Sequence, residues 1–207
     1  MALEIWLAFV VASTIMLVIP GPTVMTVVAY GLGNGARTAL ATVPGVVLGD
    51  AVAMTLSLAG AGALLAASAE LFTALKVAGA LYLIWLGIGL WRKVPKGTLE
   101  EPGAKRETAR AMFLNCFVVT ALNPKSIVFF VAFVPQFMTA EAPFWEQAMI
   151  LIPTFLVLAG LNNALWSLAA GSMRAGFSKP SARKLINRLG GGFLIGAGLL
   201  TLAAKRG

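Results

Sequence analysis

The stretch from residue 112 to 138 reads MFLNCFVVTALNPKSIVFFVAFVPQFM, and it decides the fold class. An α-helix rises about 1.5 Å per residue, so roughly 20 apolar residues cross the ~30 Å hydrocarbon core of a bilayer. This block is long enough to do so, and Asn123-Pro124 interrupts it near its centre. We therefore interpret it as a transmembrane helix that is broken at mid-depth.

Five further apolar blocks resemble this one. They lie at residues 5–30, 39–67, 71–91, 147–171 and 189–204. Hydrophobic residues make up 59% of the 207 residues and charged residues only 12%, which is about half the charged fraction of a typical soluble domain. The sequence predicts an all-α polytopic membrane protein, with six transmembrane helices in a single membrane domain over residues 1–207.

The basic residues predict how these helices are oriented. The net charge is +8, and 12 Lys and Arg residues lie in the connections 91–111 and 172–189 and at Arg37, which share one side in a six-span arrangement. The opposite side has only Lys205 and Arg206. Because basic residues near span ends stay in the cytoplasm, we expect both termini outside. A five-span arrangement with one re-entrant block would separate the termini. Basic residues in short loops do not indicate nucleic-acid binding.

A basic cytoplasmic loop, 92–111, divides the chain into two repeats of three spans, about 1–92 and 112–207. The first span of each repeat has a proline break near its centre, at Pro20-Gly21-Pro22 and at Asn123-Pro124. Three spans per repeat force the two copies into opposite orientations, and paired broken segments in inverted repeats indicate a transporter's binding site. The alternative is that these prolines only kink their helices.

Several polar features share one depth in this arrangement. Counted along each helix from its cytoplasmic end, each lies ~15–18 Å into the membrane, near the middle of the hydrocarbon core. They are Pro20, Asp50, Asn123 and Asn162. We predict that they form one polar layer at mid-membrane.

Asp50 is the only acidic residue deep within a predicted span. A carboxylate at the bilayer centre costs about 2.5–3.5 kcal/mol on insertion scales. It must therefore face a water-filled cavity, pair with a cation or take up a proton. The functional hypothesis is that Asp50 binds the coupling proton or a substrate ammonium group, and the alternative is a structural ion pair with Lys125.

The second break predicts a site for a carboxylate. Pro124 leaves backbone groups without helical partners, and the helix that follows it points its positive N-terminal end into the membrane. Lys125 adds a full positive charge. With Asp50 near an amine and residues 123–125 near a carboxylate, the sequence predicts recognition of a zwitterion. Asn162 and its neighbour Asn163 could line the same cavity or only bond adjacent helices.

The remaining residues that we single out indicate structure and not chemistry. Gly45, Gly49, Gly79 and Gly87 are typical of close helix packing. The chain has one cysteine, Cys116, and no histidine, which excludes an internal disulfide and removes the usual ligands of zinc and haem. We therefore expect no metal, no cofactor and no enzymatic acid–base pair.

Together these strings resemble the lysine exporter family (LysE/RhtB type), closest to its homoserine and threonine exporter branch. The resemblance extends over nearly the whole chain, in the strings Pro20-Gly21-Pro22, Gly45 with Gly49-Asp50, Leu75-Lys76 with Gly79-Ala80, Tyr82-Leu83 with Gly87, Asn123-Pro124-Lys125 and Pro135-Gln136-Phe137.

This resemblance implies a secondary transporter of the bacterial inner membrane. It implies export of a small amino acid such as homoserine, threonine or another neutral amino acid by proton antiport, with residues 20–22, Asp50 and residues 123–125 important. The residues alone also allow an ion or other small-metabolite transporter or channel of the same fold, and a homo-oligomer.

Overall fold

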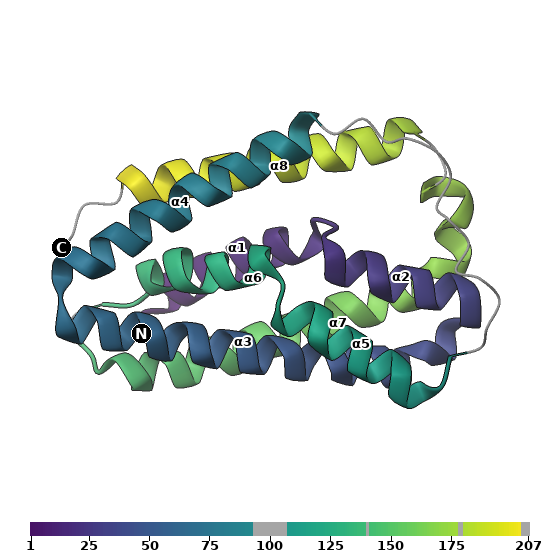
Figure 1. Cartoon of the computed structure of the whole chain (residues 1–207), viewed down its shortest axis with the longest axis horizontal. Helices are drawn as coiled ribbons and strands as arrows, with labels where there is room; N and C mark the ends of the chain where they lie inside the picture. Colours follow the sequence, from purple (N-terminus) through teal and green to yellow (C-terminus); the bar gives the residue numbers. More distant parts are fainter. Residues whose placement is uncertain (93–106, 140, 178–179, 204–207) are drawn as a thin grey trace.

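The structure is a computed structural model that describes residues 1–92, 107–139, 141–177 and 180–203, and every regular element in those ranges is helical (Figure 1). The all-α prediction is therefore confirmed. The elements are α1 (Leu3–Val18), α2 (Pro22–Asn34), the 3-10 turn η1 (Ala36–Thr38), α3 (Ala39–Ala67), α4 (Ala69–Arg92), α5 (Ala109–Ala121), α6 (Pro124–Val128), the π-helical turn η2 (Phe129–Phe133), the 3-10 turn η3 (Val134–Phe137), α7 (Phe144–Phe177) and α8 (Pro180–Ala203).

In the part of the chain that the structure describes, two to four spans meet the length and apolarity that a membrane crossing requires. α3 and α7 do so as single helices. α1 and α2 do so as a pair bent by 56°, and α5 does so with the helical segment after Pro124, bent by 41°. α4 and α8 contain shorter apolar segments, Thr73–Gly89 and Gly191–Ala203. Both predicted breaks are present, and the count of six spans stays a prediction.

Proline produces the same local structure at both breaks. Pro22 is the first residue of α2 and Pro124 is the first residue of α6. Proline suits the first turn of a helix because its fixed φ is helical and its missing N–H would have no helical partner there. The residues before them, Gly21 and Asn123, have extended backbone conformations, so the chain leaves one helix and starts another.

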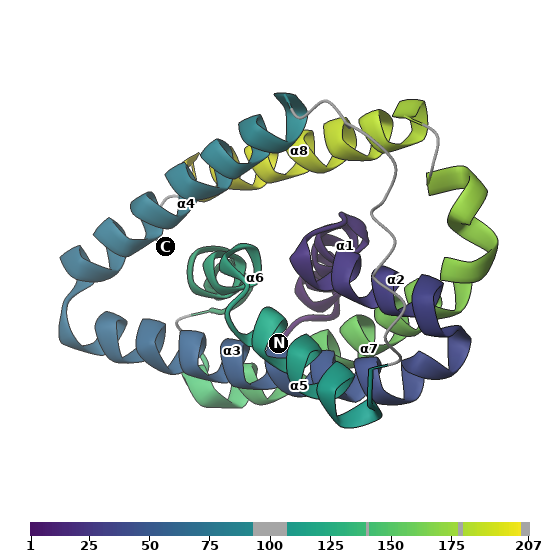
Figure 2. The ribbon, with the colours of Figure 1, turned by 45° about the vertical axis from the view of Figure 1, so that its right-hand side comes forward.

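One helix from each broken pair, α1 and α6, lies between other helices of the molecule. In Figures 1 and 2, α1 and α6 lie between the α4–α8 pair and α3. α4 packs mainly against α8, and α3 packs mainly against α5 and α7. The connection between α3 and α4 lies at the left of Figure 1, opposite the connection between α2 and α3 at the right. The two breaks are thus held close to each other in the interior.

Glycine lets α3 approach α5 closely. A Cβ atom added to Gly45 would lie 2.5 Å from the carbonyl oxygen of Phe113, and one added to Gly49 would lie 2.7 Å from that of Phe117. Both distances are shorter than real Cβ atoms tolerate, and the atoms met belong to rigid helix backbone. The two glycines therefore lie where the backbones of α3 and α5 meet, which positions the first half of the second broken helix.

The glycines of α4 make similar contacts. A Cβ on Gly87 would lie 2.6 Å from the carbonyl oxygen of Gly191 in α8. A Cβ on Gly79 would lie 2.7 Å from the Cβ of Ala132 in η2. α4 therefore lies close to both α8 and the segment that follows the second break.

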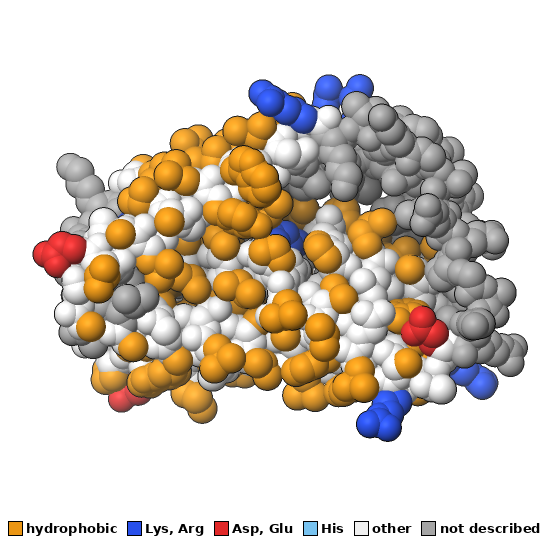
Figure 3. Space-filling view, in the orientation of Figure 1, with side chains coloured by type: hydrophobic (Ala, Val, Ile, Leu, Met, Phe, Trp, Pro, Cys, Tyr) orange, Lys and Arg blue, Asp and Glu red, His pale blue; other side chains and the backbone are white. Residues whose placement is uncertain are grey.

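The outer surface is strongly apolar. In Figure 3, hydrophobic side chains cover the middle of the visible face, and most acidic and basic side chains lie near its edges. Large residues such as Leu56, Trp85 and Leu165 are each 67% exposed. Soluble monomers rarely expose extended apolar patches, so this surface suits contact with lipid chains.

The structure differs from the sequence prediction between the last two spans. We predicted a connection at 172–189, but α7 continues to Phe177 and α8 begins at Pro180. Apolarity marks only the lipid-facing part of a helix, and a helix can continue beyond that part with polar residues. The predicted basic loop 92–111 lies mostly outside the described residues.

Candidate functional site

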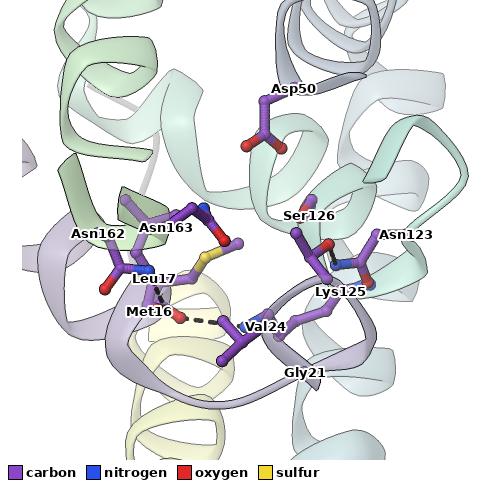
Figure 4. A pocket seen from close by; sticks show the side chains of 11 residues that line it. Met16, Leu17, Gly21, Val24, Asp50, Asn123, Lys125, Ser126, Asn162 and Asn163 are labelled. Atoms are coloured by element: carbon purple, nitrogen blue, oxygen red, sulfur yellow. Dashed lines mark hydrogen bonds between the residues drawn. The ribbon is translucent and has the colours of Figure 1, made fainter. Parts of the chain in front are cut away.

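The polar residues predicted at mid-membrane line one cavity between the two breaks (Figure 4). Of the predicted binding residues, Asp50, Asn123, Lys125 and Asn162 line it, as does Gly21 from the first break. Pro20, Pro22 and Pro124 are next to lining residues in the chain. α1, α2, α3, α6 and α7 all contribute side chains, so both halves of the molecule form the cavity.

Asp50 projects into this cavity from α3. Its side chain is 2% exposed, and its Oδ1 atom has no hydrogen-bond partner among the described residues. The Nζ atom of Lys125, which the sequence offered as an ion-pair partner, instead donates hydrogen bonds to the carbonyl oxygens of Met16 (3.1 Å) and Ile19 (2.9 Å). A buried carboxyl oxygen without a donor is unfavourable, so Asp50 requires a proton, a bound cationic group or water in the cavity.

Lys125 and Asn162 contact the end of α1. The last four carbonyl groups of a helix have no helical partner, and α1 ends at Val18. Lys125 binds the carbonyl oxygen of Met16, and the Nδ2 atom of Asn162 donates to that of Leu17 (3.1 Å). Two side chains of the second half therefore stabilise the end of the first broken helix.

Asn123 caps its own helix. Its Oδ1 atom accepts a hydrogen bond from the backbone N–H of Lys125 (3.1 Å), and its Nδ2 atom donates to Oγ1 of Thr23 (3.2 Å). Asparagine is a favoured N-cap residue because its side-chain oxygen accepts from such N–H groups. The sequence predicts that backbone N–H groups at this break bind a substrate carboxylate, but the N–H of Lys125 donates to Asn123 instead.

Three polar residues that line the cavity were not among the site residues selected from the sequence. Thr23 and Ser126 follow the two breaks directly, so their positions beside Pro22 and Pro124 were the available signal. Asn163 was named beside Asn162, but we selected Asn162. Neighbouring residues of a helix point in different directions. The side chain of Asn163 is 1% exposed, and its Oδ1 atom has no hydrogen-bond partner in the described ranges.

The cavity therefore combines bound donors with unbound acceptors. The donors of Lys125 and Asn162 are directed at backbone carbonyls and that of Asn123 at the Thr23 hydroxyl oxygen, whereas a carboxyl oxygen and an amide oxygen have no partners among the described residues. The part of the chain that the structure describes contains no group of three or more His, Cys, Asp and Glu residues that could hold a metal ion. This chemistry suits a small ligand that donates hydrogen bonds.

Comparison with known proteins gives a consistent result. Residues 14–205 match the model of the LysE type translocator family. An uncharacterized membrane protein of Vibrio cholerae is 32% identical over 206 residues, 99% of this chain and 100% of the relative. A homoserine/homoserine lactone efflux protein of Salmonella typhimurium is 31% identical over 99% of each chain. A leucine efflux protein of an Enterobacter species is 30% identical over 98% of this chain and 94% of the relative. No solved structure matches.

Proposed function

Because the chain belongs to the LysE type translocator family, we propose that it exports a small neutral amino acid, of the homoserine, threonine or leucine type, from the bacterial cytoplasm. It is a helical membrane transporter and not an enzyme. The observation that carries the proposal is Asp50, a buried carboxyl group that lacks a donor for Oδ1 among the described residues, in a polar cavity between two helix breaks.

The proposed architecture is six spans in the bacterial inner membrane, arranged as two inverted repeats. α1–α2 and α5–α6 would be the equivalent broken spans, and the cavity between them would be the transport site. The proline at the first position of both α2 and α6 supports this equivalence. The basic residues of the predicted connections 91–111 and 172–189 support a cytoplasmic location for these connections. In a six-span arrangement both termini would then lie outside.

The proposed coupling is proton antiport through Asp50. A proton that enters from outside neutralises the carboxyl group, and the ammonium group of a cytoplasmic amino acid replaces that proton. The two ligands compete for one carboxylate, so each crosses in exchange for the other. The absence of an ion pair between Asp50 and Lys125, both of which the structure describes, supports this because Asp50 keeps its charge available.

Asp50→Asn tests this function because asparagine has the same shape and does not take up a proton. We expect efflux of homoserine and leucine from loaded proteoliposomes, driven by an inward proton gradient, and loss of that efflux in the variant. Glu146→Gln, at an exposed position in the first turn of α7, is the matched control. Proton-driven efflux that persists at the wild-type rate in Asp50→Asn would contradict the proposal.

A further inference from the structure

Two buried oxygen atoms that have no hydrogen-bond donor among the described residues line the same cavity. They are Oδ1 of Asp50 and Oδ1 of Asn163, on side chains that are 2% and 1% exposed. Figure 4 shows both side chains directed into the cavity, Asp50 from α3 and Asn163 from α7. Buried polar atoms are nearly always hydrogen-bonded, so a shared pair without a donor among the described residues indicates a position for a ligand.

The orientation of the Asn163 amide is determined by its other contact. Its Nδ2 atom donates to the carbonyl oxygen of Ala159 at 2.8 Å. That carbonyl can only accept, so the nitrogen of the amide must lie beside it and the oxygen must face the other way. Asn163 therefore presents an acceptor to the cavity.

The cationic and amide donors near this pair are directed elsewhere. Lys125 donates to the carbonyl oxygens of Met16 and Ile19, and Asn162 donates to that of Leu17. The interior therefore contains the carboxyl group of Asp50 and the amide oxygen of Asn163, together with the hydroxyl groups of Thr23 and Ser126. A ligand group with at least two N–H donors suits both oxygens, and a positive charge on that group favours the carboxyl oxygen of Asp50.

We propose that Asp50 and Asn163 together bind the ammonium group of the transported amino acid, with one N–H donated to each oxygen. This rests on the proposed function and deepens it, because it names Asn163 as a residue that selects for an unsubstituted amine. Methylation tests the idea directly, since an N,N-dimethyl amino acid keeps the positive charge but retains one N–H. Such a ligand cannot donate to both oxygens.

The experiment uses the full-length protein in proteoliposomes, with L-leucine, L-homoserine and N,N-dimethyl-L-leucine as probes. We expect the wild-type protein to have a half-saturating concentration at least about tenfold higher for the dimethylated probe than for leucine, as expected for loss of one charge-assisted hydrogen bond. In Asn163→Leu, the value for leucine should rise about tenfold, and the two probes should become similar.

Asn162→Leu is the matched control. Because Asn162 binds the carbonyl oxygen of Leu17, its loss should lower the maximal rate and leave the preference for leucine over the dimethylated probe intact. Asn163→Leu should fold, because the Nδ2 contact lies within its own helix. Size-exclusion chromatography and thermal unfolding check this, and Asn163→Ala replaces the variant if it aggregates.

Three results would overturn the inference. The first is that both Asn163 variants have the same half-saturating concentration for leucine as the wild-type protein and still prefer leucine over the dimethylated probe to the same degree. The second is a Na⁺ requirement that shifts in these variants while the amine preference does not, which would assign the oxygen pair to an inorganic cation. The third is a wild-type protein that transports neither leucine nor homoserine, which would overturn the proposed function as well, whereas the first two leave it standing.

Discussion

The two helix breaks have the same proline but are stabilised differently. At the second break, Asn123 caps α6 with its own side chain. At the first, Gly21 precedes α2 and has no side chain to do this, and the end of α1 is bound by Lys125 and Asn162 from the other half of the chain. The start of α6 is therefore capped locally, with one further bond from Asn123 to Thr23, whereas the end of α1 is bound by side chains of the other half of the chain.

This difference indicates which break changes when the transporter works. A break that is held by contacts from another helix is released when that helix moves, whereas a cap within one loop moves with its helix. Lys125 lies at the start of α6 and binds the end of α1, so relative motion of the two broken helices would expose the carbonyls of Met16 and Ile19. Each prediction below removes or weakens one of these contacts, in order of decreasing effect.

The largest effect is expected for Lys125→Met. The substitution replaces lysine with an unbranched side chain one atom shorter and removes both hydrogen bonds to the end of α1. Two buried carbonyl oxygens lose that donor, at about 1–3 kcal/mol each. We expect loss of efflux and a lower thermal unfolding temperature in detergent. Lys125→Arg keeps a donor and should retain part of both properties. Wild-type stability in Lys125→Met would mean that the first break does not depend on this contact.

A smaller effect is expected for Asn123→Ala. Loss of an N-cap destabilises a helix by about 1 kcal/mol, and α6 lies next to the cavity. We expect faster amide hydrogen exchange at residues 125–128, with α1 unaffected, because Lys125 can still reach it. Asn123→Ser, which can cap α6, should restore slow exchange. If exchange instead rises at the end of α1, the two breaks are not independent.

Much of this site could be predicted from the sequence because its signals are local. Prolines within apolar blocks predicted the breaks, and counting residues along each helix placed Asp50, Asn123 and Asn162 in one layer. The family was also predicted correctly. Local signals, however, do not show which side of a helix faces which neighbour.

The contacts of Lys125 show that limit. Its charge predicted a partner for Asp50 or for a substrate carboxylate, but the structure directs its Nζ atom to carbonyls of α1. Those carbonyls are free to accept a bond from a side chain because α1 ends at Val18, and Lys125 reaches them because α6 lies beside that end. Tertiary packing therefore determines which groups Lys125 binds. It also determines that Asn162 binds the end of α1 whereas Asn163 directs its amide oxygen into the cavity.

The smallest effect is expected for Gly21→Ala, which disturbs the first break without removing a hydrogen-bonding group. A Cβ atom at this position would lie 3.3 Å from Nζ and 3.4 Å from Cε of Lys125. The backbone conformation, with φ of −119° and ψ of −168°, is accessible to alanine. The flexible end of Lys125 must therefore shift by a few tenths of an ångström, which weakens its bonds to Met16 and Ile19 and keeps them formed.

We expect Gly21→Ala to slow efflux a few-fold and to change the thermal unfolding temperature little. Gly60→Ala is the control, because a Cβ at Gly60 has no described neighbour within 4 Å; its efflux rate should equal that of the wild-type protein. Combined with Lys125→Met, Gly21→Ala should add no further loss of stability, because the contact that it disturbs is already gone. Additive losses in the double variant would show that Gly21 acts through the α1–α2 backbone and not through Lys125.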